Sequence, residues 1–390
     1  MKIAILSNLF PPNSYGGAEQ AAKAQAEKLS REGNDVFIIT LAPTKGLGGI
    51  NKIYYLKSRN IFNYYNIGKK PVWFRFLWHI IDTFNFCLAN DIVKILKREK
   101  PDLVICHNLK GLSFLTPFKI QNSKFKIHFV VHDVSLYTPS GLIEWGKENS
   151  WEHTGILTRA YRFFTRRLMG YPEKAFFPSA WLLNFYRKNG FFINQEKIYK
   201  PNDVGFVCDN KSINNQQLTI NNFLFVGKLE RHKGILLLLN VFEKLTAGLS
   251  SRAKPADSAG KSRDLITSKK LADEISPQGR NDKIVLHIIG DGSLMPEVKK
   301  YAEKNLNIKI HGTLPRGELQ KFYAQAKAVI VPSIVYENAP NVVYEALSCG
   351  APVIVSRIGG AYEPIRDGEN GDTFNPGDAE DLAEKIKKYI

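Results

Sequence analysis

Two carboxylates in the last quarter of the chain have the residue type and spacing of a ligand site. Glu337 and Glu345 stand eight positions apart, with Pro340 between them. Eight positions correspond to a turn of about 80° around an α-helix, and proline is tolerated in a first helical turn. A helix that begins at Pro340 or Asn341 therefore carries Glu345 in its second turn and leaves Glu337 in the loop before it.

Such a helix start favours a ligand that has hydroxyl groups beside phosphates. The unpaired backbone N–H groups and the positive end of the helix dipole attract phosphate, and carboxylates accept hydrogen bonds from hydroxyls. We therefore expect Glu337 and Glu345 to face one cleft at the helix N-terminus.

Length and composition are those of a globular protein with two domains. The chain has 390 residues, of which 44% are hydrophobic, and no apolar run reaches the roughly 18–20 residues of a membrane span. The first residues, MKIAILS, are more typical of a buried strand than of a secretion signal, because no small-residue cleavage site follows. The four cysteines are far apart and form no CxxC pair, so we expect reduced thiols in a cytoplasmic protein.

The net charge of +17 indicates an anionic partner. The sequence has no zinc-finger spacing and no aromatic RNA-binding motif, so we expect no nucleic acid. A phosphate ligand, an anionic membrane surface and mere solubility remain as explanations of the charge.

The N-terminal half has the strand and helix alternation of a parallel sheet. A strand at 2–7, a helical pattern closed by Gly33 and a second strand follow one another. Gly16 and Gly17 precede that helix, either where backbone comes close to a ligand or as a flexible turn. A later strand ends in His132 and Asp133, at the edge where open α/β sheets bind ligands. The alternative is a histidine that is simply satisfied at a strand end.

Two stretches of this half, 54–86 and 159–192, are rich in aromatic residues. The later part of the first predicts one helix running to Lys100. The second interleaves aromatic residues with many more basic than acidic ones. This pattern is typical of a membrane-interface patch, although helices with aromatic cores and solvated arginines give the same pattern.

The second half repeats the strand and helix alternation, so we predict an α/β protein with two Rossmann-like doubly wound domains facing a central cleft. An N-terminal, acceptor-binding domain covers 1–200 and a polar linker covers 201–222. A C-terminal, nucleotide-binding domain covers 223–376, with a disordered insertion at 247–282. A terminal helix lies at 377–390. Lys228 and Lys233 lie in a loop that enters a helix, where both can reach a diphosphate, although two solvated lysines are the alternative.

Six motifs in one order resemble the retaining glycosyltransferases of family 4, which have the GT-B fold. FPPNSYGGAEQ resembles the glycine loop of that family, and VVHD resembles its His-Asp strand end. FVGKLERHKG resembles its basic donor-phosphate motif, and IIGDG one of its strand-turn segments. HGTLPRGELQKFYAQAKAVIVPS resembles the segment before its acidic motif, and ENAPNVVYEALSCGAPVIVSRIGG that acidic motif itself. The resemblance covers most of the chain.

The resemblance implies transfer of a hexose from a nucleotide-diphosphate sugar, with retention at the anomeric carbon. It implies that Glu345 binds the ribose hydroxyls and Glu337 the donor sugar, and that His132 touches the sugar near the reacting carbon. The implied catalytic residues are His132, Glu337 and Lys233. The implied donor-binding residues are Gly16, Gly17, Lys228, Lys233, Gly290, Gly312, Leu314, Glu337, Asn338, Ala339, Pro340 and Glu345.

The resemblance also implies that neither a metal ion nor a cofactor is needed, because lysines supply the positive charge. It favours front-face attack by the acceptor hydroxyl over a covalent intermediate on a carboxylate. The expected partners are the nucleotide sugar, a glycan or lipid-linked acceptor of the cell envelope, and an anionic membrane surface, with the protein at the inner face. UDP-glucose, UDP-N-acetylglucosamine and GDP-mannose all stay open as donors.

Two departures from the family pattern qualify these expectations. Lys228 stands where the family usually has arginine. Its ammonium group lacks the bidentate geometry with which a guanidinium binds phosphate. The chain stops at Ile390, before a helix that is typical of the family, so we expect a C-terminally truncated sequence. A catalytically inactive sugar-nucleotide-binding protein of the same fold is the alternative function.

Overall fold

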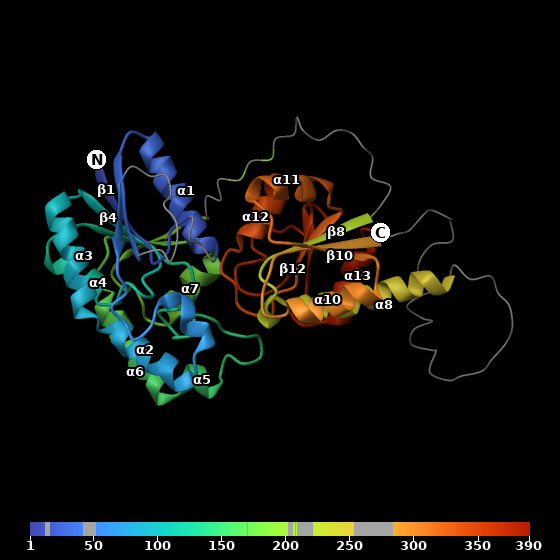
Figure 1. Cartoon of the computed structure of the whole chain (residues 1–390), viewed down its shortest axis with the longest axis horizontal. Helices are drawn as coiled ribbons and strands as arrows, with labels where there is room; N and C mark the ends of the chain where they lie inside the picture. The colour runs from blue at the N-terminus through green and yellow to red at the C-terminus, as the bar shows by residue number, and fades with distance from the viewer. Residues whose placement is uncertain are drawn as a thin grey trace. The chain divides into compact units, whose positions relative to one another are not determined.

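The computed structural model describes residues 1–11, 16–41, 52–169, 171–201, 206, 208, 221–252 and 284–390. Their contacts divide the chain into two compact units. Unit 1 comprises Met1–Gly205 and Glu337–Asn341, and unit 2 comprises Phe206–Tyr336 and Val342–Ile390. Each unit is a parallel sheet with helices on both sides (Figure 1).

Unit 1 contains a seven-stranded sheet in the order β3-β2-β1-β4-β5-β6-β7, in which every pair is parallel. Its strands are β1 (Lys2–Leu6), β2 (Asp35–Leu41), β3 (Ile53–Leu56), β4 (Leu103–Cys106), β5 (Ile127–Val130), β6 (Lys174–Phe177) and β7 (Glu196–Tyr199). Its helices are α1 (Gly17–Arg31), η1 (Tyr64–Lys69), α2 (Val72–Thr83), α3 (Phe86–Glu99), α4 (Thr116–Asn122), α5 (Trp151–Thr154), α6 (Ile156–Leu168) and α7 (Ala180–Lys188). Small residues of α1 pack on buried residues of β1, β2 and β4.

The single helix predicted to run to Lys100 is wrong, because the structure has two helices there. α2 ends at Thr83 and α3 begins at Phe86. Between them, the side chain of Asn85 accepts a hydrogen bond from the backbone N of Leu88 (3.1 Å). Asparagine is a strong N-cap residue, and here it starts a new helix inside an apolar run.

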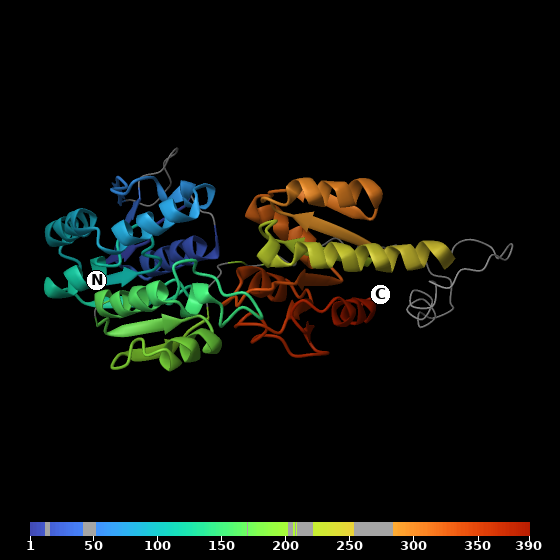
Figure 2. The ribbon, with the colours of Figure 1, turned by 90° about the horizontal axis from the view of Figure 1, so that it is seen from below.

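Unit 2 contains a six-stranded parallel sheet in the order β10-β9-β8-β11-β12-β13. Its strands are β8 (Asn221–Val226), β9 (Ile284–Ile289), β10 (Ile308–Gly312), β11 (Ala328–Val331), β12 (Val353–Ser356) and β13 (Gly371–Phe374). Its helices are η3 (Arg231–Lys233), α8 (Ile235–Arg252), α10 (Met295–Lys304), α11 (Arg316–Gln325), α12 (Asn341–Ser348) and α13 (Ala379–Lys387). A core of aliphatic and aromatic side chains joins the sheet to α8, α10 and α13, and α8 is the long yellow helix of Figure 2. The predicted insertion begins inside α8, which reaches Arg252, and residues 253–282 lie outside the described residues.

Each sheet has one point where the strand order reverses direction along the chain. In unit 1 this switch lies between β1 and β4, and in unit 2 it lies between β8 and β11. The loops that leave the two strands at such a point diverge, which opens a crevice at the carboxyl edge of the sheet. The fold thus marks two loop pairs as the sites for ligand chemistry.

The expectation of four reduced thiols is wrong for two of the cysteines. Cys208 and Cys349 form a disulfide, with 5.1 Å between their Cα atoms, so residue 208 is tied to the turn after α12. Cys87 is an exposed free thiol and Cys106 a buried one. The cysteines therefore give no argument for a reducing compartment, and the cytoplasmic location stays a prediction.

A matched pair of glycines tests the packing at the unit 2 switch. Gly234 and Gly350 both have φ of 72°, but a Cβ at Gly234 would lie 1.7 Å from the carbonyl oxygen of Pro332, whereas a Cβ at Gly350 would meet nothing within 4 Å. Gly350→Ala should lower the free energy of unfolding by about 1 kcal/mol, the cost of the left-handed backbone. Gly234→Ala should lower it by about 3 kcal/mol or more, because backbone must also move. Equal losses in denaturant titrations would contradict the close approach at Gly234.

Candidate active site

In unit 2 the two switch-point loops are bonded to each other. The backbone N of Ile334, after β11, donates to the carbonyl oxygen of His232, after β8 (3.0 Å). Gly234 sits against Pro332, as described above. Lys228 is exposed and Lys233 is half-buried on the same β8 loop. Both ammonium-bearing side chains thus belong to a switch-point loop, the part of an open α/β sheet where ligands commonly bind.

Glycines bring the loops after β8, β9 and β10 close together. Gly290 has φ of 139°, and a Cβ there would lie 1.8 Å from the carbonyl oxygen of Gly227. The N–H of Gly290 donates to the carbonyl oxygen of Gly312 (2.8 Å). Gly312 ends β10, and the half-buried Leu314 follows it in the loop toward α11. This edge of the sheet thus presents main chain rather than side chains.

Glu345 is held by two donors that the sequence did not single out. Its side chain lies in α12, and the residue is 8% exposed. One carboxylate oxygen accepts from Nη2 of Arg316 (2.9 Å), and the other accepts from the hydroxyl of Tyr323 (3.0 Å). Each oxygen has a second lone pair, so the carboxylate is fixed in place and can still accept from a ligand. The helix begins at Asn341, which confirms the predicted start and puts Glu345 in the second turn.

The segment Glu337–Asn341 belongs to unit 1 and is hydrogen-bonded to other parts of that unit. The side-chain amide of Asn338 donates to the carbonyl oxygen of His132 (3.1 Å), and its Oδ1 accepts from the hydroxyl of Ser179. Nδ2 of Asn341 donates to the carbonyl oxygen of Gly17, the first residue of α1 (3.4 Å). Gly16 is the N-cap of that helix. Two predicted site positions, His132 and Asn338, are therefore hydrogen-bonded to each other, and a third, Gly17, is bonded to Asn341 of the same segment.

The other predicted residues of this segment are at least partly buried. Glu337 and Pro340 are half-buried, and Ala339 is 8% exposed. Glu337 and Glu345 belong to different units, so their expected shared cleft stays a prediction.

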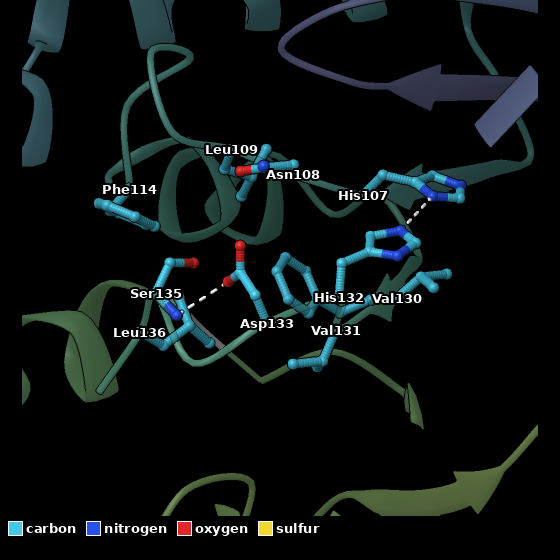
Figure 3. Close-up of a pocket in the computed structure, with 11 residues that line it drawn as sticks. His107, Asn108, Leu109, Phe114, Val130, Val131, His132, Asp133, Ser135 and Leu136 are labelled. Atoms are coloured by element: carbon cyan, nitrogen blue, oxygen red, sulfur yellow. Dashed lines mark hydrogen bonds between the residues drawn. The ribbon is translucent and has the colours of Figure 1, made fainter. Parts of the chain in front are cut away.

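The unit 1 switch point is bonded in the same manner as that of unit 2. The backbone N of Asn8, after β1, donates to the carbonyl oxygen of Asn108, after β4 (2.9 Å), and its side-chain amide donates to the carbonyl oxygen of Lys110 (3.0 Å). His107 and His132 directly adjoin this pair of loops. A cavity of ≈ 10 Å³, about the room of one water molecule, is lined by both histidines, Asp133 and Ser135 (Figure 3).

His107 is a partner of His132 that sequence reasoning missed. Nδ1 of His107 lies 2.8 Å from Nε2 of His132, and the two rings stack at 18° (Figure 3). Burial is the main cause that lowers the pKa of His132 to about 4, and burial, together with the neighbouring His132, lowers the pKa of His107 well below its usual value. Both rings are therefore neutral near pH 7. The only sequence signal was a histidine at the end of a second buried strand, VICHN.

The environment of His107 assigns the proton between the two rings. Its Nε2 is buried and has no hydrogen-bond partner among the described residues. An orphaned N–H is rarer in proteins than an orphaned acceptor, so Nε2 is the bare nitrogen and Nδ1–H donates to Nε2 of His132. His132 then carries its own proton on Nδ1, which is the polar group of that ring left for a ligand.

Two features are absent from the part of the chain that the structure describes. No helix among them combines the length and apolarity needed to cross a membrane. Within the same residues, no three potential ligands from His, Cys, Asp and Glu gather as a metal site would require. Metal independence remains a prediction, since it concerns the reaction rather than the resting protein.

Two protein-family models match this chain. "Glycosyltransferase Family 4" matches residues 15–199, and "Glycosyl transferases group 1" matches residues 266–390. A Klebsiella pneumoniae chain described as an uncharacterized 42.6 kDa protein in cps region is 25% identical over 375 residues, which cover 94% of this chain and 88% of that one. An uncharacterized glycosyltransferase of Methanocaldococcus jannaschii is 26% identical over 410 residues, covering 100% of this chain and 89% of that protein.

Among solved structures, Anabaena HepE in complex with UDP has a similar fold. Its TM-score is 0.65 at 16% identity, with 100% of this chain and 89% of that chain covered. This likeness confirms the predicted fold class, GT-B, with two Rossmann-like units.

The hydroxyl of Tyr323 gives a test of how Glu345 is held. Tyr323 is fully buried, so Tyr323→Phe should lower the free energy of unfolding by about 1–2 kcal/mol, because a buried carboxylate loses a donor. The control is Tyr301→Phe on α10, whose hydroxyl bonds to Asn240 at an exposed site and whose loss should cost less than about 0.5 kcal/mol. Equal effects in thermal or denaturant unfolding would contradict the role of Tyr323.

The histidine pair predicts how stability depends on pH. The folded pKa values are lowered, so between about pH 6.5 and 4 the unfolded chain binds more protons, and stability falls as the pH falls. His107→Phe should flatten that dependence by up to about 1.4 kcal/mol per pH unit. The measurement is the free energy of unfolding at several pH values. An unchanged slope would show that His107 is protonated in the folded protein.

Proposed function

Because the chain belongs to the family 4, group 1 glycosyltransferases, we propose that it is a retaining hexosyltransferase that uses a nucleotide-diphosphate sugar. The observation that carries this proposal is the unit 2 switch point, where Lys228 and Lys233 lie on the β8 loop. The same unit holds the fixed carboxylate of Glu345. A polyanion with adjacent hydroxyls is the ligand that such groups recognise. HepE, which has the same fold, is described in complex with UDP.

The proposed reaction breaks the bond between the anomeric carbon and the diphosphate oxygen. The acceptor hydroxyl oxygen bonds to that carbon on the same face, and its proton passes to the departing phosphate. Lys228 and Lys233 stabilise the negative charge that develops on the diphosphate, so the proposal requires neither a metal ion nor a cofactor. The alternative, a covalent intermediate on a carboxylate, is not part of the proposal.

Each remaining site residue has a proposed role toward the donor. Glu345 accepts hydrogen bonds from the ribose hydroxyls, and the main chain of Gly290, Gly312 and Leu314 cradles the base and ribose. Glu337 accepts from the sugar hydroxyls, with backbone N–H groups of Asn338 and Ala339 beside it and Pro340 shaping the turn. The N–H of Nδ1 in His132 points to the sugar oxygen nearest the reacting carbon. Gly16 and Gly17 allow the main chain of α1 to approach the diphosphate.

The proposed acceptor is a hydroxyl of a glycan or lipid-linked molecule of the cell envelope, reached from the cytoplasmic face of the membrane. The description of the Klebsiella relative as a protein in cps region supports a polysaccharide pathway, and the basic charge of the chain supports an anionic partner.

A donor panel tests the proposal. UDP-glucose, UDP-N-acetylglucosamine and GDP-mannose are added to the purified protein, and the melting temperature is measured, because a ligand that binds the folded state raises it. The donor that gives the largest shift is then assayed for slow hydrolysis or transfer, and NMR gives the anomeric configuration of the product. An inverted product would contradict retention. Tight binding without turnover would instead support an inactive sugar-nucleotide-binding protein.

Lys233 is the residue whose loss should most affect the chemical step. Lys233→Ala should lower kcat by about 100-fold or more, because a donor aimed at developing charge is lost. The control is Lys244→Ala on α8, an exposed lysine of the same unit, which should leave kcat unchanged. If both variants behave alike, Lys233 does not stabilise the leaving group.

A further inference from the structure

Helix α6 buries polar residues and exposes large apolar ones. Its buried residues are Thr158 and Thr165, whereas its exposed positions include large apolar side chains. These are Ile156 (82% exposed), Leu157 (59%), Phe163 (56%) and Phe164 (40%). A surface helix of a globular protein normally buries its apolar face. α6 instead buries two threonines and exposes four of its large apolar residues, while Tyr161 and Leu168 are half-buried.

Helix α2 has a second exposed apolar stripe. Trp73, Phe76, Leu77 and Ile80 follow the i, i+3, i+4, i+7 spacing of one helix face, and each is more than 40% exposed. Trp78, on the opposite face, is fully buried. A different face of α2 therefore packs in the core of unit 1, and the exposed stripe takes no part in that packing.

The two stripes belong to one region of unit 1. The ring of Phe84, at the C-cap of α2, lies 5.1 Å from the ring of Phe164 on α6. Helix α5, which directly precedes α6, adds Trp151 (75% exposed). Figure 1 shows α2, α5 and α6 along the same margin of the unit. We call the exposed apolar residues of these three helices the apolar margin.

Positive charge exceeds negative charge around the apolar margin, whose three helices carry one exposed acid, Glu152 on α5. Arg159, Arg166 and Arg167 are exposed on α6, which contains no acidic residue. The only acidic residue of α2, Asp82, is buried and accepts from the backbone N of Gly111 (2.9 Å). Within the described part of the chain, no ion pair joins these three arginines to an acid. Guanidinium groups beside exposed aromatic rings match the headgroup and acyl boundary of a bilayer with anionic lipids.

We propose that the apolar margin of α2, α5 and α6 docks unit 1 onto an anionic lipid bilayer. The aromatic and aliphatic side chains enter the acyl boundary while the arginines of α6 remain with the phosphates of the headgroups. The proposal names a membrane partner for the proposed function. It rests on that function only for the purpose that the binding would serve, since lipid binding itself is measured without any sugar donor. Exposed apolar area of this kind on a protein face also fits a protein partner, but the unneutralised arginines favour lipid phosphate.

The experiment is co-sedimentation of the full chain with vesicles of neutral phosphatidylcholine, with and without 30% anionic phosphatidylglycerol. We expect binding to the anionic vesicles, with at least tenfold less at 0.5 M salt or without the anionic lipid. The double variant Arg159→Glu and Arg167→Glu should bind at least tenfold less. Its control, Lys299→Glu and Lys300→Glu, makes the same charge change at exposed positions of α10 in unit 2 and should bind as the wild type does.

The apolar contribution is tested separately. Trp151→Ser combined with Ile156→Ser should reduce binding several-fold, whereas Leu306→Ser, at a 79% exposed position of unit 2, should not. Circular dichroism confirms that each variant is folded. Absence of vesicle binding at low salt would overturn the proposal, as would equal loss in the α6 and α10 charge variants, which would indicate attraction through net charge alone. Donor hydrolysis remains measurable in every variant, so a failure of lipid binding is distinct from a failure of glycosyl transfer.

Discussion

A buried carboxylate must be supplied with donors, and in unit 2 this requirement links the fold to the site. Glu345 receives one hydrogen bond from Arg316 and one from Tyr323, both on α11. Removing one partner of such a group costs far more than the bond itself contributes, because the charge stays buried. The two helices are therefore fixed relative to each other, and the first turns of α12 keep one orientation. The disulfide between Cys208 and Cys349 holds the other end of that helix.

The same architectural rule places chemistry in both units. Each sheet is parallel and reverses its strand order once, and in each the two diverging loops are bonded through their main chains. Unit 1 thereby holds the paired imidazoles of His107 and His132, which burial keeps neutral near pH 7. Unit 2 holds the lysines of the β8 loop and a glycine-lined edge. The two switch points thus differ in charge, with neutral imidazoles at that of unit 1 and ammonium groups at that of unit 2.

Local patterns in the sequence predicted the fold class and the start of α12, since strand alternation and the position of Pro340 are visible within short windows. Interactions between distant residues could not be predicted in this way. Arg316 lies 29 positions before Glu345 and His107 lies 25 before His132, and only the folded sheet brings each pair together. The prediction of reduced thiols was wrong for the same reason, because Cys208 and Cys349 are 141 positions apart. The aromatic stretches left a surface patch and aromatic helix cores as alternatives, and only the exposure of each side chain in the structure separates the apolar margin from residues such as Trp78.

The central claim is that Glu345, held by Arg316 and Tyr323, binds the nucleotide part of the donor. Isothermal titration of nucleoside diphosphates into the wild type, Glu345→Ala and the exposed α10 control Glu303→Ala measures it most directly. Titrations are made at a temperature where all three proteins are folded. The account predicts that Glu345→Ala lowers the affinity at least tenfold, about 1.4 kcal/mol or more, and that Glu303→Ala leaves it unchanged. Wild-type affinity in folded Glu345→Ala would contradict the claim.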